Sequence, residues 1–194
     1  SETAARIFDQ PLSDINSEMR RKAKEVNFGL IYGMEAFGLS KSLDIPQKEA
    51  KKLIDAYFDQ FPKVKGFLQE VVSNAAKNTY TKTLFGRKRY IRELASTNFQ
   101  LKAMGKRIAM NAPIQGTASD IMKIAMIKVH VALNNFDNAN LLLQIHDEIV
   151  VEAKNKDLDK VSRVATKNMQ NAVKLDVPLY VNTKLNTSLA NFNN

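Results

Sequence analysis

The sequence predicts a mostly helical α+β protein, in which a helical region is followed by part of an antiparallel sheet with packed helices. Two observations predict this class. Apolar residues recur at helical spacing through the first half of the chain. Near the other end, two short β-prone runs, 141–145 and 149–151, flank an acidic turn. We therefore expect a helical region over residues 1–110 and a second region over 111–194, with a hairpin at about 139–153.

The first segments contain a short helix and then a longer one. Residues 1–8 suit a short helical turn, and the polar stretch 13–17 offers several N-caps for the next helix. That helix is expected at about 17–33, with its end near Gly33, and Gly38 is expected to mark another break.

Prolines divide the middle of the chain. Pro46 suits the first position of a helix, and Pro62 separates that helix from another one, which suggests a helical hairpin. Residues 80–91 then predict a short β-hairpin with a basic tip at 87–89. The tip is either an ordinary exposed turn or a contact for a phosphate backbone.

Three further elements are expected before the C-terminus. A helix over 97–110 should be interrupted at 111–113, because proline disfavours helix at the residue before it, and a second helix should follow over 115–133. After the acidic hairpin, an amphipathic helix is expected over 158–173 and a strand over 178–185.

The composition favours an anionic partner. Twenty-nine Lys and Arg residues against twenty Asp and Glu give a formal charge of +9, as in many nucleic-acid-binding proteins. The chain has no cysteine, which excludes disulfides and thiolate metal sites. No apolar run approaches the roughly 20 residues that span a bilayer, so we expect no membrane partner.

The helix expected at 17–33 carries the most informative pattern. Arg20, Lys24, Phe28 and Tyr32 recur every fourth residue and fan over about 120° of one face. The opposite face is apolar and should pack on a core; it contains Ala23, Val26, Leu30 and Met34. The exposed face is either ordinary amphipathic surface or a site that binds a polyanion and stacks a base or sugar.

The string R-x3-K-x3-F-x3-Y-G resembles the nucleotide-binding helix of family A DNA polymerases, the bacterial DNA polymerase I type. Downstream, Gln144-Ile145-His146-Asp147-Glu148 resembles the carboxylate turn of the same family. The resemblance implies that residues 1–110 correspond to the fingers and residues 111–194 to the C-terminal part of the palm. It also implies a bacterial-type cytoplasmic protein, with an organellar one left open.

The resemblance assigns roles to the helix. Arg20 and Lys24 match ligands of the incoming triphosphate, and Lys24 is also expected to assist catalysis by offsetting phosphate charge. Phe28 matches the position that packs against the sugar, and Tyr32 matches the base-pair end of the helix. The implied partners are a dNTP and a DNA primer–template.

The carboxylate turn is expected to hold magnesium. Asp147 matches a metal ligand and Glu148 a supporting catalytic residue in a two-metal Mg²⁺ site, while His146 matches a residue near the primer end. Without the resemblance, an Asp-Glu pair at a turn is more often solvated surface. The family also needs an aspartate in a D-Y-S-Q-I-E-L-R-like segment, and residues 1–19 contain none, so we expect the chain to be a fragment with half of the metal site.

A third pattern, Arg107-x3-Asn111-x3-Gln115, resembles family residues that contact primer and template. Arg, Asn and Gln can meet the acceptors that base pairs present in the minor groove. The leading hypothesis is therefore a fragment of a template-directed DNA polymerase, active in replication or repair, that lacks the other polymerase segments. Two alternatives stay open: a related polymerase that uses RNA, and a non-catalytic basic DNA-binding module.

Overall fold

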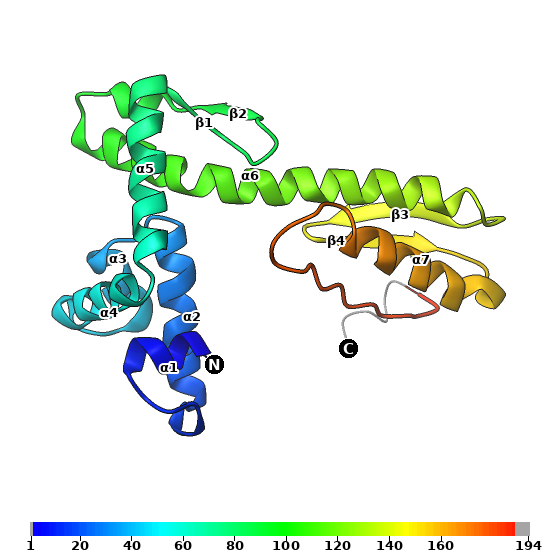
Figure 1. Cartoon of the computed structure of the whole chain (residues 1–194), viewed down its shortest axis with the longest axis horizontal. Helices are drawn as coiled ribbons and strands as arrows, with labels where there is room; N and C mark the ends of the chain where they lie inside the picture. Colours follow the sequence, from blue (N-terminus) through cyan, green and yellow to red (C-terminus); the bar gives the residue numbers. More distant parts are fainter. Residues whose placement is uncertain (1, 189–194) are drawn as a thin grey trace. The chain divides into compact units, whose positions relative to one another are not determined.

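The chain divides into two units within one long helix, α6 (Phe99–Leu133). The structure is a computed structural model that describes residues 2–188 (Figure 1). The first unit extends through Thr117, and the second begins at Ala118. The first unit therefore includes Asn111 and Gln115, which lie beyond the boundary expected at residue 110. The mostly helical α+β class is confirmed.

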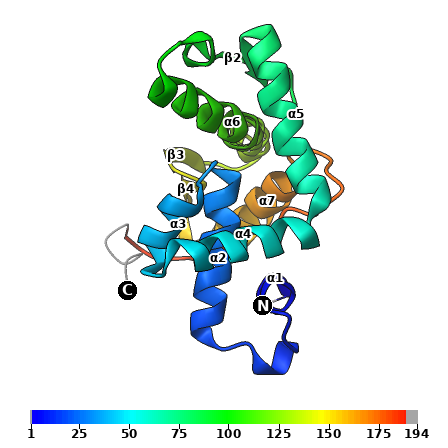
Figure 2. The ribbon, with the colours of Figure 1, turned by 90° about the vertical axis from the view of Figure 1, so that its left-hand side faces the viewer.

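Four helices enclose the main core of the first unit (Figures 1 and 2). They are α1 (Glu2–Phe8), α2 (Ser17–Ile31), α3 (Ala36–Leu43) and α4 (Gln47–Gln60), with a short 3₁₀ turn, η1 (Leu12–Asp14), between the first two. The buried residues come from every one of these helices and include Ala4, Ile7, Ala23, Val26, Leu30, Leu39, Leu43, Ala50, Leu53 and Tyr57. The predicted apolar face of α2 is thus confirmed.

Helix α2 begins and ends where the sequence predicts. The Asn16 side chain caps its first turn by accepting a hydrogen bond from the Met19 amide at 2.8 Å. At the other end, Gly33 adopts a left-handed conformation with φ of 72°. This conformation lets the Met34 amide donate to the Gly29 carbonyl at 2.7 Å, which closes the helix in a Schellman arrangement.

The break expected at Gly38 is wrong, because Gly38 lies inside α3. A glycine costs a helix only about 1 kcal/mol, which packing can offset. Here the missing side chain makes room for a neighbour, since a Cβ on Gly38 would lie 2.9 Å from Cγ of Met34. The helix ends instead at Asp44, which is left-handed with φ of 53°.

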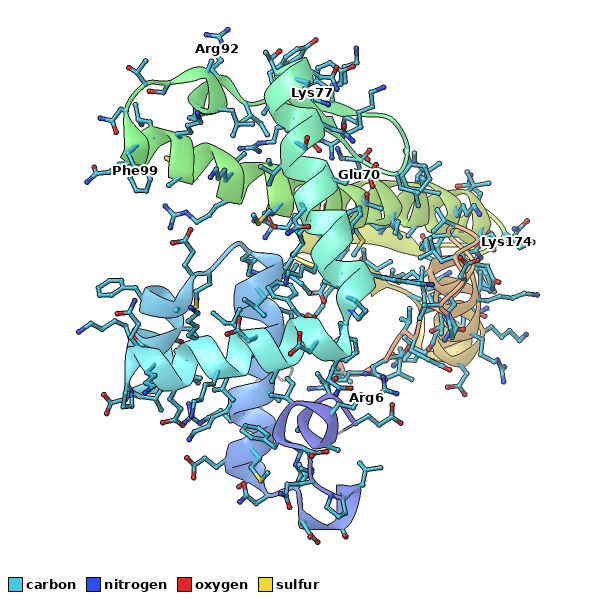
Figure 3. The ribbon with its side chains drawn as sticks, turned by 60° about the vertical axis from the view of Figure 1, so that its left-hand side comes forward. Arg6, Glu70, Lys77, Arg92, Phe99 and Lys174 are labelled. Carbon is cyan, nitrogen blue, oxygen red and sulfur yellow. The ribbon has the colours of Figure 1, made fainter. Side chains whose placement is uncertain are left out.

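Helix α5 (Pro62–Asn78) starts with proline at its first turn, as expected. The helical hairpin is not formed. A single residue, Phe61, separates α4 from α5, and this is too short to reverse the chain, so α5 leaves α4 at a steep angle (Figure 3). The Phe61 ring packs on Tyr57 with 4.9 Å between centroids, which fixes this corner.

The hairpin expected over 80–91 is present, but the basic tip expected at 87–89 is wrong, because Lys88 and Arg89 lie in the second strand while Arg87 lies in the loop. Strands β1 (Tyr80–Lys82) and β2 (Lys88–Tyr90) pair antiparallel, with Tyr80 opposite Tyr90, and Gly86 takes φ of 83° in the loop. The 3₁₀ turn η2 (Arg92–Ala95) follows. A second core of the unit joins α5, η2 and α6 and contains Ala75, Ile91, Leu94 and Ala109.

The interruption expected at 111–113 is wrong, because α6 is continuous over 35 residues with Pro113 inside it. The Asn98 side chain caps its start by accepting from the Gln100 amide at 2.9 Å. Proline removes one amide donor and crowds the carbonyl four residues earlier. The turn that follows Pro113 contacts the β1–β2 loop, where Nη2 of Arg87 donates to the Gly116 carbonyl at 3.0 Å.

The second unit packs a hairpin and a helix around the end of α6. Strands β3 (Asn140–Ile145) and β4 (Glu148–Glu152) pair antiparallel, and η3 (Asn155–Asp157) leads into α7 (Leu158–Gln170). The core contains Val129, Leu133, Ala139 and Val161. The strand expected at 178–185 is wrong, because these residues form no strand and, within residues 2–188, the sheet of this unit consists of β3 and β4.

In the part of the chain that the structure describes, no helix combines the length and apolar character that crossing a membrane requires.

Candidate functional site

The four residues of the predicted nucleotide face lie together on the exposed side of α2. Arg20 and Lys24 are exposed, and Phe28 and Tyr32 keep 46% and 40% of their surface accessible. Between them, Ala23, Val26 and Leu30 are at most 5% exposed. Because the apolar side of α2 holds it on the core, the other side presents these four residues on a fixed backbone.

The cations on this face are not neutralised by carboxylates. Within residues 2–188 neither Arg20 nor Lys24 forms an ion pair, whereas Lys22, on the same helix, pairs with Glu18 at 3.3 Å. The Lys24 ammonium lies 5.9 Å from the centre of the Phe28 ring, at the outer limit of a cation–π contact. Both cations therefore remain available for an anionic ligand.

The aromatic end of the face forms a pair of rings. Phe28 and Tyr32 have 6.3 Å between centroids and an angle of 33° between planes. Large aromatic surface left exposed costs free energy unless a ligand covers it, and flat groups such as bases stack on such rings. The order along α2 is thus two free cations followed by two accessible rings.

A buried hydrogen bond anchors α2 to α4. The Tyr57 hydroxyl donates to Oδ1 of Asn27 at 2.8 Å, and Tyr57 is 3% exposed. Burial raises the pKa of the Tyr57 hydroxyl above its ordinary value of 10.0, because the ionised form loses solvation. Asn27 lies next to Phe28, so this bond limits rotation of the helix that carries the exposed face. The sequence patterns gave no sign of this bond, because its two partners are 30 positions apart.

The end of α2 touches the helix that carries the other predicted DNA contacts. A Cβ on Gly33 would lie 2.9 Å from Cγ and 3.2 Å from Cα of Arg107, and 3.2 Å from Sδ of Met110. Gly33 thus brings Tyr32 and Arg107 onto neighbouring positions within the first unit. The sequence patterns placed these residues in two separate motifs.

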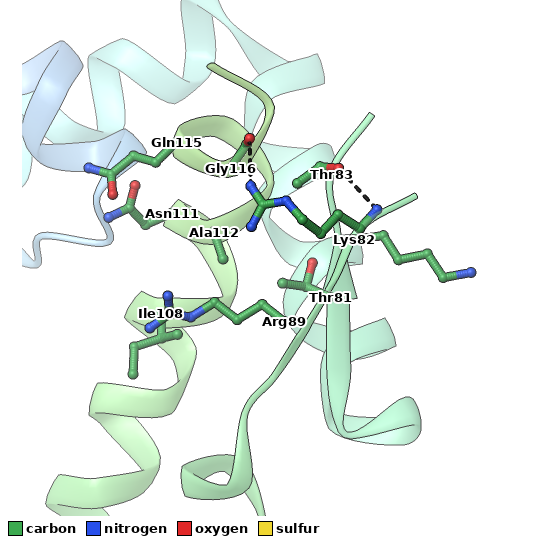
Figure 4. A pocket seen from close by; sticks show the side chains of 10 residues that line it. Thr81, Lys82, Thr83, Arg89, Ile108, Asn111, Ala112, Gln115 and Gly116 are labelled. Atoms are coloured by element: carbon green, nitrogen blue, oxygen red, sulfur yellow. Dashed lines mark hydrogen bonds between the residues drawn. The ribbon is translucent and has the colours of Figure 1, made fainter. Parts of the chain in front are cut away.

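Asn111 and Gln115 lie together in a pocket of about 140 Å³ between α6 and the β1–β2 hairpin (Figure 4). The hairpin contributes polar and basic residues to the same pocket, namely Thr81, Lys82, Thr83, Arg87 and Arg89. Oδ1 of Asn111 is buried without a hydrogen-bond partner among residues 2–188. The pocket therefore combines basic side chains with an amide that still has hydrogen-bonding capacity.

Arg87 and Thr117 connect the hairpin to α6. Nη2 of Arg87 donates to the Gly116 carbonyl at 3.0 Å, and the Leu84 amide donates to Oγ1 of Thr117 at 2.9 Å. Oγ1 of Thr117 also donates to the Pro113 carbonyl at 2.5 Å. From the sequence, only the charge of the hairpin was noted, and these contacts were missed. The available signal was Thr117, which lies four residues after Pro113 and can bond to its carbonyl.

The acidic residues occupy the turn of the hairpin in the second unit. Ile145 pairs with Glu148, so His146 and Asp147 form the two-residue turn, and His146 is left-handed with φ of 55°. The Gln144 side chain donates to the His146 carbonyl at 3.0 Å. His146 and Asp147 are exposed, and so is Glu148, the first residue of β4. The carboxylates of Asp147 and Glu148 therefore lie at the end of a paired hairpin, with their oxygens open to a ligand.

The two carboxylates are oxygen ligands of the kind that Mg²⁺ prefers. Mg²⁺ is usually bound by one or two carboxylates together with substrate phosphates, and Asp147 and Glu148 fit that requirement. Within residues 2–188, no group of three or more His, Cys, Asp and Glu side chains is arranged to hold a metal ion.

The chain belongs to DNA polymerase family A, whose family description matches residues 1–191. It is 47% identical over 186 residues to DNA polymerase I of Caldicellulosiruptor bescii, covering 95% of this chain and 22% of that protein. It is 44% identical over 179 residues to DNA polymerase I of Mycobacterium tuberculosis, covering 92% of this chain and 20% of that protein. The chain therefore spans about a fifth of the length of these curated relatives.

A solved structure gives the same relationship. The POL domain of Pol1 from M. smegmatis, in complex with DNA primer-template and dNTP, matches with a TM-score of 0.86 and 41% identity. The match covers 91% of this chain and 31% of that one. The predicted family membership is thus confirmed for nearly the whole chain.

Proposed function

We propose that the chain is the part of a template-directed DNA polymerase, serving replication or repair, that binds the incoming dNTP and the primer–template. The exposed face of α2 carries the proposal, because it orders two unneutralised cations and two accessible rings along one rigid helix. The M. smegmatis protein that resembles this chain was solved with primer-template and dNTP, which supports the same ligands here. In this proposal residues 1–110 belong to the fingers and residues 111–194 to the C-terminal part of the palm.

In this proposal each residue of the exposed face of α2 contacts a different part of the nucleotide. Arg20 and Lys24 bind the triphosphate, and Lys24 also offsets the charge that develops when pyrophosphate leaves. Phe28 packs against the sugar, and Tyr32 packs against the base-pair end. A triphosphate carries several negative charges, so its electrostatic attraction is strongest to cations that are not paired with carboxylates. Among the described residues, Arg20 and Lys24 are such cations.

Asp147 and Glu148 would hold Mg²⁺ together with the phosphates of the nucleotide, with Asp147 as the direct ligand. Mg²⁺ held there would supply positive charge that favours attack by the 3′-oxygen and departure of pyrophosphate. The hairpin turn keeps both carboxylates exposed and fixed by strand pairing. His146, in the same turn, contacts the primer end.

The primer–template is bound by Arg107, Asn111 and Gln115. Asn111 and Gln115 lie in one pocket, and Arg107 lies against the end of α2, so the DNA contacts adjoin the base end of the nucleotide face. Amide and guanidinium groups can meet the minor-groove acceptors of any correct base pair. The formal charge of +9 adds an attraction for the DNA backbone that does not depend on sequence.

We further propose that these 194 residues alone do not extend a primer. Asp147 and Glu148 supply one part of a two-metal site, and the described residues bring no third acid to it. By itself the chain would then behave as a basic DNA-binding module.

Primer extension tests both statements. The chain is mixed with a labelled primer–template and Mg²⁺, first alone and then with the upstream polymerase segment of a family A relative. We expect extension only in the mixture, with dNTPs and not with ribonucleotides. Asp147→Asn should abolish it, whereas Asp137→Asn, at an exposed acid in the loop before β3, should not. The proposal would be refuted if the chain alone extends the primer, or if Asp147→Asn leaves extension by the mixture unchanged.

A further inference from the structure

The loop of the β1–β2 hairpin, residues 83–87, is bound to one turn of α6. Arg87 donates to the Gly116 carbonyl, and the Leu84 amide donates to Thr117 Oγ1. Thr83 is 9% exposed and packs so closely that a Cβ on Gly116 would lie 2.6 Å from its Cγ2. Thr83, Leu84 and Arg87 of the loop thus contact the adjacent helix residues Gly116 and Thr117.

The loop also holds its own shape. The Thr83 amide donates to the Arg87 carbonyl at 3.0 Å, and the Arg87 amide donates to Thr83 Oγ1 at 3.2 Å. The Gly86 amide donates to the Thr83 carbonyl at 3.0 Å. A loop closed by its own hydrogen bonds loses little further entropy when it contacts the helix, so it can act as a rigid support.

The supported turn follows the weakest point of α6. Pro113 provides no amide hydrogen, so the helix lacks one backbone hydrogen bond at that level. Thr117 donates its hydroxyl to the Pro113 carbonyl while it accepts from Leu84. The loop therefore contacts the turn directly after Pro113, whereas the hydrogen bond that proline cannot make belongs to the turn before it.

The same stretch of α6 carries two residues of the proposed DNA site. Asn111 precedes Pro113, and Gln115 lies directly before the residue whose carbonyl binds Arg87. Figure 4 shows Gln115 and Asn111 near each other on α6, and Arg87, which donates to the Gly116 carbonyl, lines the same pocket. A small rotation of this turn would move the Gln115 amide away from a base edge.

We propose that Arg87, Thr83 and Thr117 are positioning residues that fix Gln115 for contact with the primer–template. The inference rests on the proposed function, since it assumes that Gln115 contacts DNA. Arg87 has this role although it is a cation, because Nη2 of its guanidinium is bound to a backbone carbonyl of α6. It acts through the helix and not as a ligand of a DNA phosphate.

A double-mutant cycle on the full chain tests the inference. Binding to a fluorescent primer–template is measured by anisotropy for the unaltered chain, Arg87→Gln, Gln115→Ala and the double variant, at several salt concentrations. Thr117→Val, which keeps the shape but removes the hydroxyl, is a second route to the same effect. Arg92→Gln is the matched control, since Arg92 is an exposed arginine on η2 outside the pocket.

We expect Arg87→Gln and Thr117→Val to weaken binding about threefold or more, and to have almost no effect once Gln115 is alanine. Arg92→Gln should have the same effect in both backgrounds. The slope of log affinity against log salt should be unchanged in Arg87→Gln, whereas loss of a phosphate contact would lower its magnitude by about 0.9. A circular dichroism spectrum like that of the unaltered chain confirms that each variant folds.

Additive effects of Arg87 and Gln115, or a lowered salt slope in Arg87→Gln, would overturn the inference and leave the proposed function intact. Failure of the unaltered chain to bind the primer–template would overturn the proposed function and the inference together. Binding that is indifferent to Gln115→Ala would also overturn the inference, because Gln115 would then have no contact to position.

Discussion

Gly33 and Arg107 are in contact, so the end of α2 rests directly on the backbone of α6. A side chain on Gly33 would lie 3.2 Å from Cα of Arg107, closer than packed carbon atoms normally approach. Gly33 also has φ of 72°, a conformation that favours glycine. Two independent constraints therefore require glycine at the point where the nucleotide face meets the DNA-binding helix.

Gly33→Ala is expected to destabilise the first unit. The left-handed conformation alone costs alanine about 1–2 kcal/mol, and the contact with Arg107 adds to that cost. Urea unfolding measures the loss. Gly66→Ala is the control, because a Cβ there meets nothing within 4 Å and Gly66 lies inside α5, so this variant should gain up to about 1 kcal/mol. Equal effects of the two substitutions would contradict the contact.

Gly116→Ala should destabilise the protein although it replaces glycine inside a helix. Helix propensity favours alanine by about 1 kcal/mol, but the new methyl group would overlap Cγ2 of Thr83, and such overpacking costs about 1–3 kcal/mol. Thr83→Ser removes that methyl group and should restore most of the stability in the double variant. If Gly116→Ala alone is stabilising in thermal or urea unfolding, the hairpin does not dock on α6 as described.

Tyr57 should make the protein lose stability at high pH. Its pKa is raised by burial, so above about pH 10 the unfolded chain releases the hydroxyl proton before the folded chain does. The contribution is complete below the unfolded pKa and is lost as pH rises toward the folded pKa. Urea unfolding between about pH 8 and about pH 11, from two units below to one unit above the ordinary tyrosine pKa, should show a smaller loss of stability at alkaline pH for Tyr57→Phe.

The hydroxyl of Tyr57 also binds Asn27, so Tyr57→Phe should cost about 1–3 kcal/mol at neutral pH by leaving Oδ1 of Asn27 unsatisfied. Tyr180→Phe, at a side chain that is 85% exposed, is the control and should change neither the stability at neutral pH nor the loss of stability at alkaline pH. If Tyr57→Phe and the unaltered protein lose the same stability at alkaline pH, groups other than Tyr57 cause that loss.

Local signals predicted α2 and both hairpins well. The limits of α2 follow from Asn16 and Gly33, which act on their own backbone neighbours, and the buried face follows from its helical period. The turn at His146 and Asp147 is set by two strands close in sequence. Residues that determine structure within a few positions can be identified without knowledge of the fold.

The errors arose where distant contacts override local preference. Gly38 stays helical because Met34 fills the space beside it, and Pro113 stays inside α6 while the loop at Arg87 supports the following turn. A strand over 178–185 would need a partner, which no local pattern specifies. The pocket at Asn111 and Gln115 was likewise out of reach, because its other wall comes from the hairpin some 30 positions earlier, as the 29-residue separation of Arg87 and Gly116 shows.

Titration of the chain with a fluorescent dNTP tests the central claim, that the exposed face of α2 binds the nucleotide, most directly. Arg20→Gln and Lys24→Gln should each weaken binding about tenfold or more, since each removes a hydrogen bond from a charged group to phosphate. Arg21→Gln removes the same charge from an exposed position on α2 outside the face, and should have little effect. Equal weakening by all three variants would show only general attraction to positive charge, and would contradict the account.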